Sequence, residues 1–372
     1  MALLCRSTSK KSMGPGNINP HLLKRCAAKL ATPLTQLCRE CLTSQTWPAL
    51  WKQARVVAVH KRGSRTNPKN YRPIPLLSVV GKTLEILITR KVTAFLDADH
   101  LNYRQFGFRS DKSAIDLLLL SFTEWNIAID SGREVFIVYL DIAGALDWLW
   151  HKGVTAKVRS LGVCGGLLHL LEDCLHGRTL HTVVNGHSIV CLRAVSSGLC
   201  SGVSDILQLV PEAQAYADEC TLTFTCDRNH RQDTVDRINV VLQSSASCSR
   251  RWQITLAPER TQVLHIFRRR EDTHPLAIFI EGRRLPFQQS ISVLRVEVDA
   301  GLTFTTHVRK VARDPAWKLS CVRRAGKILD GWGIASLYRT QVRHVMEYTP
   351  LTWSSYLAKL ERIQARAQGW YT

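Results

Sequence analysis

Carboxylates stand at two places in the sequence where negative charge is costly. Asp141 closes the apolar segment Glu134 to Leu140, whose Val, Ile, Phe and Tyr content predicts a buried strand. Asp218 and Glu219 occupy a turn predicted between two further strands. Neighbouring carboxylates at strand ends repel one another unless a cation neutralises them, and hard divalent ions, Mg²⁺ above all, take oxygen ligands. A metal site is therefore one interpretation of these positions.

A pair of such ions has a defined chemistry. Two ions about 4 Å apart, held by carboxylates from two strands, can activate a 3′-hydroxyl and stabilise a leaving pyrophosphate. In a chain with 50 Lys and Arg against 30 Asp and Glu, a formal net charge of +20, this chemistry points to synthesis or cleavage of a polynucleotide. The alternative is that Asp218 only accepts hydrogen bonds from amides of its turn, a frequent use of Asp. Periodicity alone does not decide between a metal site and this structural role of Asp218.

The elements that position these carboxylates follow from hydrophobic periodicity. Apolar residues at helical spacing predict helices within residues 19–42, 84–96, 154–161, 167–175 and 235–245. Apolar or alternating runs predict strands at residues 56–59, 134–140, 214–216 and 220–226, and a hairpin around residues 281–283. The C-terminal part is basic, rich in Trp and mostly helical in pattern. Strands in the middle with helices on both sides predict an α+β core flanked by helical lobes.

Composition excludes several classes of protein. The length of 372 residues allows two or three compact lobes, and 45% hydrophobic with 22% charged residues is typical of a globular chain. The longest apolar stretches, such as Leu117 to Leu120, are too short to span a membrane, and the N-terminus lacks the apolar core of a signal peptide. We expect an intracellular protein, in the nucleus or cytoplasm, without a membrane partner. The charge alone would also suit a protein that only sits on RNA or ribosomes.

Twelve cysteines are scattered from Cys5 to Cys321, and only Cys38 and Cys41 form a CxxC pair. No second CxxC or neighbouring pair of histidines completes a zinc-binding set. Reduced, buried thiols are therefore the expected state.

Blocks along nearly the whole chain resemble, in the same order, those of reverse transcriptases from non-LTR retrotransposons of the jockey type. Tyr216-Ala217-Asp218-Glu219 resembles the YADD turn of that family, and Leu140 to Asp147, followed by Trp150-His151, resembles its LDIxxAFDxxWH block. The other matching blocks are KSMGP at 11–15, NYRPIPLLS at 70–78, QFGFR at 105–109, WSS at 353–355 and LERIQ at 360–364. Together these blocks are far more specific than any one of them.

The resemblance implies an α+β fold, the right-hand polymerase, with fingers, a palm made of a small antiparallel sheet with helices, and a helical thumb. On this basis residues 1–45 form an N-terminal extension and the start of the fingers, and residues 46–130 form the fingers. Residues 131–270 form the palm, which looks shortened between 198 and 218, and residues 271–372 form the thumb and connection.

The resemblance also implies an activity, RNA-directed DNA polymerisation by two metal ions. Asp141, Asp218 and Glu219 would be the catalytic and metal-binding carboxylates for two Mg²⁺ ions, with Mn²⁺ as a substitute. The expected partners are an RNA template, a DNA primer and deoxynucleoside triphosphates.

Further site residues are carried over from the matching blocks. Arg72 would contact the incoming triphosphate, a role that suits a planar cation, and Leu146 would lie under the nucleotide sugar. Lys61, Arg109 and Gly198 would lie at the template and primer.

Four departures from the family pattern predict reduced activity or none. Glu219 stands where the family has Asp and adds a methylene, which can displace an oxygen by about 1 Å. Leu146 replaces the Phe that excludes a ribose 2′-hydroxyl. Arg260 replaces a Lys before Thr261 and cannot donate a proton as Lys can, while Ala257 replaces an Asn.

The fourth and largest departure lies between Gly198 and Asp218. A loop of the PQGSxLSP type is expected here, followed by an apolar helix, but Ser196-Ser197 replace Pro-Gln and the apolar block looks excised. Loss of that helix would open a core cavity and misplace the template. We also expect no endonuclease domain before the polymerase. The alternatives to an active polymerase are a catalytically inactive nucleic-acid-binding remnant and an unstable product of a genomic relic.

Overall fold

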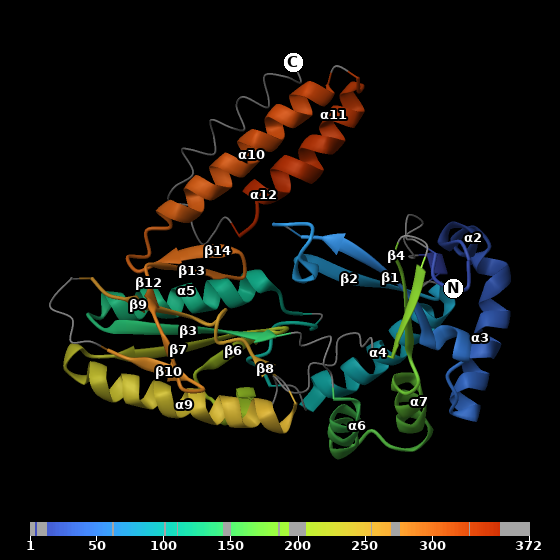
Figure 1. Cartoon of the computed structure of the whole chain (residues 1–372), viewed down its shortest axis with the longest axis horizontal. Helices are drawn as coiled ribbons and strands as arrows, with labels where there is room; N and C mark the ends of the chain where they lie inside the picture. Colours follow the sequence, from blue (N-terminus) through green and yellow to red (C-terminus); the bar gives the residue numbers. More distant parts are fainter. Residues whose placement is uncertain are drawn as a thin grey trace. The chain divides into compact units, whose positions relative to one another are not determined.

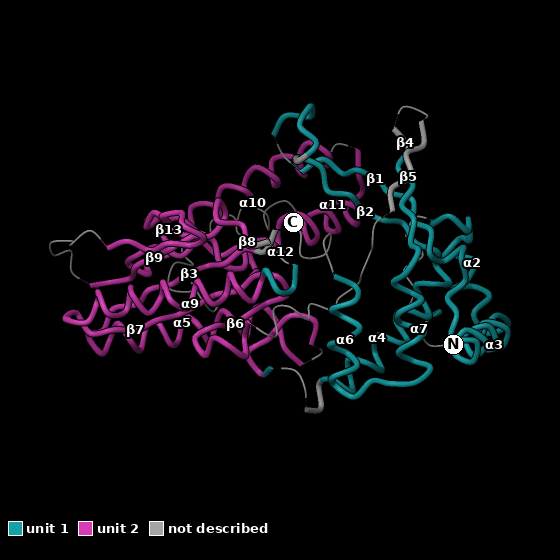
Figure 2. Tube along the Cα trace, turned by 60° about the horizontal axis from the view of Figure 1, so that its bottom comes forward, with its two compact units in different colours: residues 1–102, 144–204, 250–255 teal, residues 103–143, 205–249, 256–372 magenta. Residues whose placement is uncertain are grey.

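The computed structural model describes residues 4–5, 13–61, 63–99, 102–109, 111–143, 150–184, 187–192, 206–253, 255–268, 276–326 and 328–349. The chain divides into two compact units built from discontinuous segments (Figure 2). The first unit consists of residues 1–102, 144–204 and 250–255, and the second of residues 103–143, 205–249 and 256–372. Both combine helices with strands, which confirms the predicted α+β class.

The first unit contains one sheet and several helices. Its sheet has the order β2-β1-β4-β5, with β1 antiparallel to β2 and parallel to β4. The strands are β1 (Gln53–His60), β2 (Tyr71–Leu77), β4 (Thr179–Val184) and β5 (His187–Leu192), with the 3₁₀ turns η1 (Ala49–Lys52) and η2 (Pro68–Asn70). The helices are α2 (Pro20–Arg25), α3 (Ala27–Ser44), α4 (Val79–Asp99), α6 (His151–Ser160) and α7 (Gly165–Leu175). The helices predicted in this part are confirmed, and the strand predicted at 56–59 is longer at both ends.

Two of the blocks identified in the sequence are packed together within this unit. Gly14, of the block at 11–15, lies against the end of the block at 70–78. A Cβ on Gly14 would lie 2.1 Å from the carbonyl oxygen of Leu77, so only glycine allows this approach. The buried core of the unit includes Trp47, Trp51 and Leu84.

The second unit is built on a sheet with the order β12-β9-β3-β7-β6. Its strands are β3 (Glu134–Ala143), β6 (Ala213–Tyr216), β7 (Glu219–Cys226), β9 (Gln262–Ile266) and β12 (Phe287–Gln288), and the short β8 (Thr255–Leu256) also pairs with β3. The strands predicted at 134–140, 214–216 and 220–226 are confirmed. β3 continues past Asp141 to Ala143, whereas its pairing with β7 ends at Asp141, opposite Glu219.

Two helices lie on opposite faces of this sheet (Figure 1), α5 (Ala114–Asp130) and α9 (Arg231–Arg251). α9 confirms the helix predicted at 235–245. Trp125 of α5 donates from Nε1 to the hydroxyl of Thr223 at 3.1 Å, whereas Arg237 of α9 lies over the ring of Phe224. Since neighbouring strand residues point to opposite faces, these contacts place the two helices on different sides.

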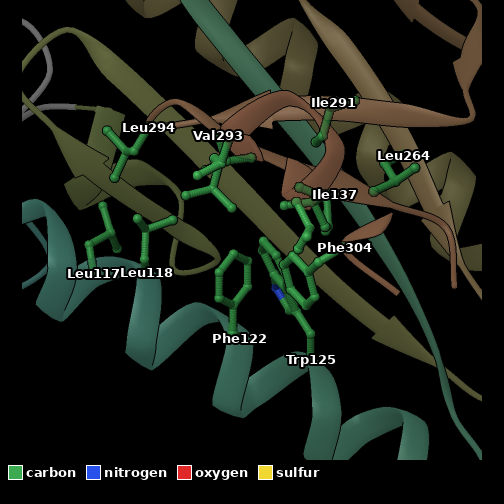
Figure 3. Close-up of a cluster of buried hydrophobic side chains, with 14 of the residues drawn as sticks. Leu117, Leu118, Phe122, Trp125, Ile137, Leu264, Ile291, Val293, Leu294 and Phe304 are labelled. Carbon is green, nitrogen blue, oxygen red and sulfur yellow. The ribbon is translucent and has the colours of Figure 1, made fainter. Parts of the chain in front are cut away.

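The largest buried cluster fills the α5 face of the sheet (Figure 3). Phe122 and Trp125 of α5 point toward Ile137 of β3 and toward Phe304. A capping box starts α5: the Ser113 hydroxyl accepts from the N–H of Asp116, and the Asp116 carboxylate accepts from the N–H of Ser113. Packing against α5 therefore fixes the position of β3, the strand that carries Asp141.

The C-terminal part of the second unit consists of two hairpins and a helical region. The hairpins are β10 (Ile278–Ile280) with β11 (Arg283–Leu285), and β13 (Ser290–Val293) with β14 (Val296–Asp299). The helical region comprises α10 (Thr305–Ala325), α11 (Gly331–Leu337), the π-helical η4 (Tyr338–Arg343) and α12 (His344–Met346). The first hairpin confirms the prediction at 281–283, with Glu281 and Gly282 both at positive φ as a type I′ turn requires.

None of the described helices combines the length and the apolar character that crossing a membrane would take. None of the described cysteines is in a disulfide.

Candidate active site

Asp141, Asp218 and Glu219 come together at one end of the sheet in the second unit. Asp141 of β3 is the register partner of Glu219 at the start of β7. Tyr216 at the end of β6 also pairs with Glu219, so Ala217 and Asp218 form a two-residue hairpin loop. Register and loop therefore hold the three carboxylates at neighbouring positions, as the sequence predicts for the strand and the turn.

The Glu219 side chain is partly buried beside the other two carboxylates. Burial, and then the negative charges of Asp218 and Asp141, raise its pKa above the ordinary value, while a hydrogen bond from the Tyr139 hydroxyl opposes this. Burial, and then the Glu219 charge, raise the pKa of Tyr139 as well. The phenol therefore stays protonated at neutral pH and donates to Glu219. Oε2 of Glu219 is buried and has no hydrogen-bond partner among the described residues.

This donor set fits a hard divalent cation. Strands β3 and β7 and the β6–β7 loop supply three carboxylates, which are the ligands that Mg²⁺ prefers. A buried carboxylate oxygen without a partner is costly unless a cation or a proton meets it. Within the described ranges, however, no three side chains of His, Cys, Asp or Glu are gathered as a ready-made metal site.

A different cation lies at Asp141. Arg260 Nε is 2.8 Å from Asp141 Oδ2, and the Arg260 side chain is 53% exposed while that of Asp141 is 20% exposed. The sequence identifies Arg260 only as a replacement for Lys, and no local pattern predicts that it reaches a residue so distant along the chain. The pair was therefore missed by sequence reasoning.

The segment before α5 supports the loop that carries Asp218. Phe106 donates its backbone N–H to the carbonyl of Ala215 at 2.8 Å, and Ala215 donates to the carbonyl of Arg104 at 3.0 Å. Gln105 in this segment therefore forms an isolated parallel β-bridge with Ala215 of β6. Gly107 then packs against the backbone of Ala217, which has a left-handed φ of 60°. The QFGFR block thus contacts the candidate site through its backbone.

Arg104 precedes this block and Arg109 ends it, and the two side chains have different surroundings. Arg104 donates to the carbonyls of Leu207, Val210 and Ala213, which follow or belong to a helical turn at 206–209. It was not identified from the sequence, since a cap on carbonyls so distant along the chain has no local signal. Arg109 is 11% exposed at its side chain and 3.8 Å from Asp111.

The other predicted site residues lie elsewhere or outside the described residues. Lys61 and Arg72 belong to the first unit, where both are exposed on the β1–β2 hairpin. Arg72 is the register partner of Val59 across the two strands. The backbone N–H of Lys61 donates a hydrogen bond to the carbonyl of Asn70 at 2.7 Å. Leu146 and Gly198 lie outside the described residues, as do the blocks at 353–364 and the segment at 193–205.

Comparison with known proteins identifies relatives over most of the chain. A family model described as "Reverse transcriptase (RNA-dependent DNA polymerase)" matches residues 59–298. The chain is 25% identical over 328 residues to the probable RNA-directed DNA polymerase from transposon X-element of Drosophila melanogaster, covering 83% of this chain and 36% of that protein.

Two further relatives come from the same organism. The chain is 26% identical over 329 residues to the probable RNA-directed DNA polymerase from transposon BS, and 23% identical over 331 residues to the RNA-directed DNA polymerase from mobile element jockey. These alignments cover 82% and 83% of this chain and 36% of each relative. The chain thus spans about a third of the length of the curated relatives it matches.

Proposed function

Because this chain belongs to the reverse transcriptase family and is similar to the polymerases of jockey-type non-LTR retrotransposons, we propose that it is an RNA-directed DNA polymerase. It would extend a DNA primer along an RNA template, taking up deoxynucleoside triphosphates and releasing pyrophosphate. The observation that carries this proposal is the convergence of Asp141 on β3, Glu219 on the neighbouring β7 and Asp218 in the β6–β7 loop.

Asp141, Asp218 and Glu219 would hold two Mg²⁺ ions, for which Mn²⁺ can substitute. When bound, such ions activate the primer 3′-hydroxyl and stabilise the leaving pyrophosphate. Glu219 offers a buried oxygen, and Tyr139 fixes the orientation of the same carboxylate through its hydrogen bond. This orientation matters because Glu219 is one methylene longer than the Asp of the related YADD turn, and misplacement by about 1 Å is costly in catalysis.

The right-hand architecture extends the proposal to the whole chain. We assign the sheet of the second unit to the palm, the β1–β2 hairpin of the first unit to the fingers, and helices α10 to α12 to the thumb. The domain ranges 1–45, 46–130, 131–270 and 271–372 remain a prediction. The segment 103–130, which contains α5, belongs to the same compact unit as the palm strands.

Basic residues on the fingers hairpin are proposed to contact the nucleotide and the template. Arg72 and Lys61 are both exposed, so their cationic groups are accessible to phosphate. Arg109 and Gly198 keep their proposed role at the template and primer, and Leu146 keeps its proposed role at the nucleotide sugar.

An exposed stripe on α10 supports a thumb that follows a nucleic-acid backbone. Arg309, Arg313, Trp317 and Arg324 are all exposed, and their spacing places them along one side of the helix. Trp317 is 66% exposed, which is unusual for so large an aromatic side chain. Arginines suit phosphate contacts, and an exposed aromatic ring suits stacking on a base or sugar.

One observation favours a second function, an inactive nucleic-acid-binding remnant. The pair between Arg260 and Asp141 places a side-chain cation at the proposed metal ligand. The net charge of +20 would still give salt-dependent binding to nucleic acid without any chemistry.

Primer extension on poly(rA)/oligo(dT) with Mg²⁺ or Mn²⁺ separates the two functions. Weak extension that disappears in both Asp141→Ala and Asp218→Ala is the expected result for a polymerase. Absence of extension, with intact salt-dependent binding to the same duplex, would instead identify the binding remnant. Extension that survives both substitutions would refute the proposed catalytic carboxylates.

A further inference from the structure

The Arg260 guanidinium is placed beside Asp141 by backbone hydrogen bonds of residues 257–261. The Ala257 N–H donates to the Asp141 carbonyl oxygen at 3.0 Å, so the segment after β8 is fixed to the end of β3. The N–H groups of Arg260 and Thr261 both donate to the Ala257 carbonyl at 2.9 Å, and the Thr261 hydroxyl donates to it at 3.0 Å. Arg260 therefore belongs to a tight turn whose first residue, Ala257, is hydrogen-bonded to the backbone of Asp141.

The surroundings of the turn distinguish this pair from a surface ion pair between two mobile side chains. Ala257 and Thr261, the residues that anchor the turn, are both buried, whereas Arg260 is 53% exposed. An exposed ion pair usually contributes little to stability, since two long side chains must be ordered in water. Here the backbone has already positioned one partner, so less entropy is lost when the pair forms.

We propose that Arg260 is an internal counter-ion that competes with a divalent metal ion for the carboxylate of Asp141. The proposal rests on the proposed function, in which Asp141 is a metal ligand. A guanidinium bound to Oδ2 neutralises the charge that would attract the metal ion, and two cations that share one carboxylate repel one another. Metal binding at Asp141 therefore requires the guanidinium to swing away, which its exposure to solvent allows.

Mn²⁺ binding to the full chain tests the competition without relying on catalysis. Free Mn²⁺ is measured by electron paramagnetic resonance during titration of the wild type, Arg260→Gln and Arg260→Lys. Arg268→Gln is the matched control, because it also removes one arginine from an ion pair of the second unit, with Asp130. β9 brings that pair near Glu134, about 23 Å along β3 from Asp141.

We expect Arg260→Gln to bind Mn²⁺ about 1.4- to 5-fold more tightly than the wild type, since an exposed pair is worth about 0.2–1 kcal/mol and about 1.4 kcal/mol is tenfold. Arg260→Lys keeps the charge and should fall between the two, and Arg268→Gln should match the wild type. The gain should vanish in the double variant Asp141→Asn with Arg260→Gln. A change in Arg260→Gln no larger than in Arg268→Gln would overturn the proposal.

The single variant Asp141→Asn separates failure of this inference from failure of the proposed function. If Asp141→Asn binds Mn²⁺ as tightly as the wild type, Asp141 is not a metal ligand, and both proposals fail together. If Asp141→Asn binds more weakly while Arg260→Gln is unchanged, the metal site stands and only the competition is wrong.

A second measurement follows the wild-type chain itself and uses a variant only to assign one signal. The Nε–H signal of Arg260 in a ¹⁵N correlation spectrum, assigned by its absence in Arg260→Lys, is followed during Mg²⁺ titration. We expect this signal to shift as the pair opens, in step with metal occupancy. A signal that stays unchanged at saturating Mg²⁺ would also overturn the competition.

Discussion

Gly107 and Ala217 approach each other so closely that no side chain fits between them. A Cβ on Gly107 would lie 2.2 Å from the backbone nitrogen of Ala217 and 2.8 Å from its Cα. Ala217 precedes Asp218 in the two-residue loop, so this contact presses the segment before α5 against the loop that carries a proposed metal ligand. The packing of this segment against the Asp218 loop therefore depends on glycine at position 107.

Replacing Gly107 by Ala should lower the free energy of unfolding and displace the Asp218 loop. The added methyl would overlap backbone atoms, which cannot move as a flexible side chain can, and overpacking of this kind costs about 1–3 kcal/mol. Urea denaturation measures the loss. Gly331→Ala, in the same unit and with nothing within 4 Å of its added Cβ, is the control and should be close to neutral. Equal stability of the two variants would refute the close contact.

Glu134 at the opposite end of β3 should be the most sensitive charged residue of the sheet. Its side chain is 3% exposed, and it accepts from Arg231 Nε at 2.6 Å and pairs with His265 Nε2 at 2.9 Å. Glu134→Gln leaves the Arg231 charge without its counter-ion, so we expect a loss of about 3 kcal/mol in chemical denaturation. Arg268→Gln, which breaks an exposed pair, should cost less than about 1 kcal/mol. A loss in Glu134→Gln as small as in this control would contradict the buried pairing.

Acid should destabilise the second unit through His307. Burial lowers the pKa of His307 from 6.5 to about 4, against the opposing charge of Glu297. Above pH 6.5 the ring is neutral in both the folded and the unfolded chain, but between pH 6.5 and 4 only the unfolded chain binds the proton. Stability is therefore lost as the pH falls through this range, by about 2 kcal/mol at pH 5. Thermal unfolding of the wild type at several pH values measures this loss.

The variant His307→Asn shows whether the loss belongs to this residue. Asn keeps an acceptor for the N–H of Glu297, which His307 Nδ1 now accepts at 3.3 Å, but it does not titrate. The melting temperature of this variant should fall less steeply between pH 6.5 and 5. An identical slope would assign the acid sensitivity to other groups.

The turn between β13 and β14 stores strain that glycine would relieve. Leu294 and Arg295 both have positive φ, 46° and 69°, in a two-residue turn where Gly is strongly preferred. Arg295→Gly should therefore be more stable than Arg295→Ala by about 1 kcal/mol. The comparison with Ala removes the effect of the lost charge, which lies near Glu219. Equal melting temperatures for the two variants would show that the turn is not strained.

The sequence predicts the central strand and its loop well, because their signals are local. The run from Val135 to Leu140 is continuously apolar, and residues 220–226 alternate with period two, so each strand is visible alone. Helix α5 is absent from the predicted elements. Its run Leu117 to Leu120 is apolar on every side and has no helical period, although the helix fills the largest core cluster.

The site was only partly predictable for the same reason. The carboxylates stand at strand ends, which periodicity locates, and the family resemblance assigns them a role. Contacts between distant segments leave no local pattern, so the support of Ala217 by Gly107, the cap formed by Arg104 and the pairing of Arg260 with Asp141 become visible only in the folded chain.

The central claim is that the end of β3 and the β6–β7 loop hold divalent ions, and Fe²⁺-directed cleavage tests it most directly. Fe²⁺ replaces Mg²⁺, and hydroxyl radicals made with ascorbate and peroxide cut the backbone near the bound ion. We predict cuts close to Asp141 and Asp218 that are lost in Asp141→Asn and competed by Mg²⁺. Cuts confined to other segments, or unchanged in Asp141→Asn, would contradict the claim.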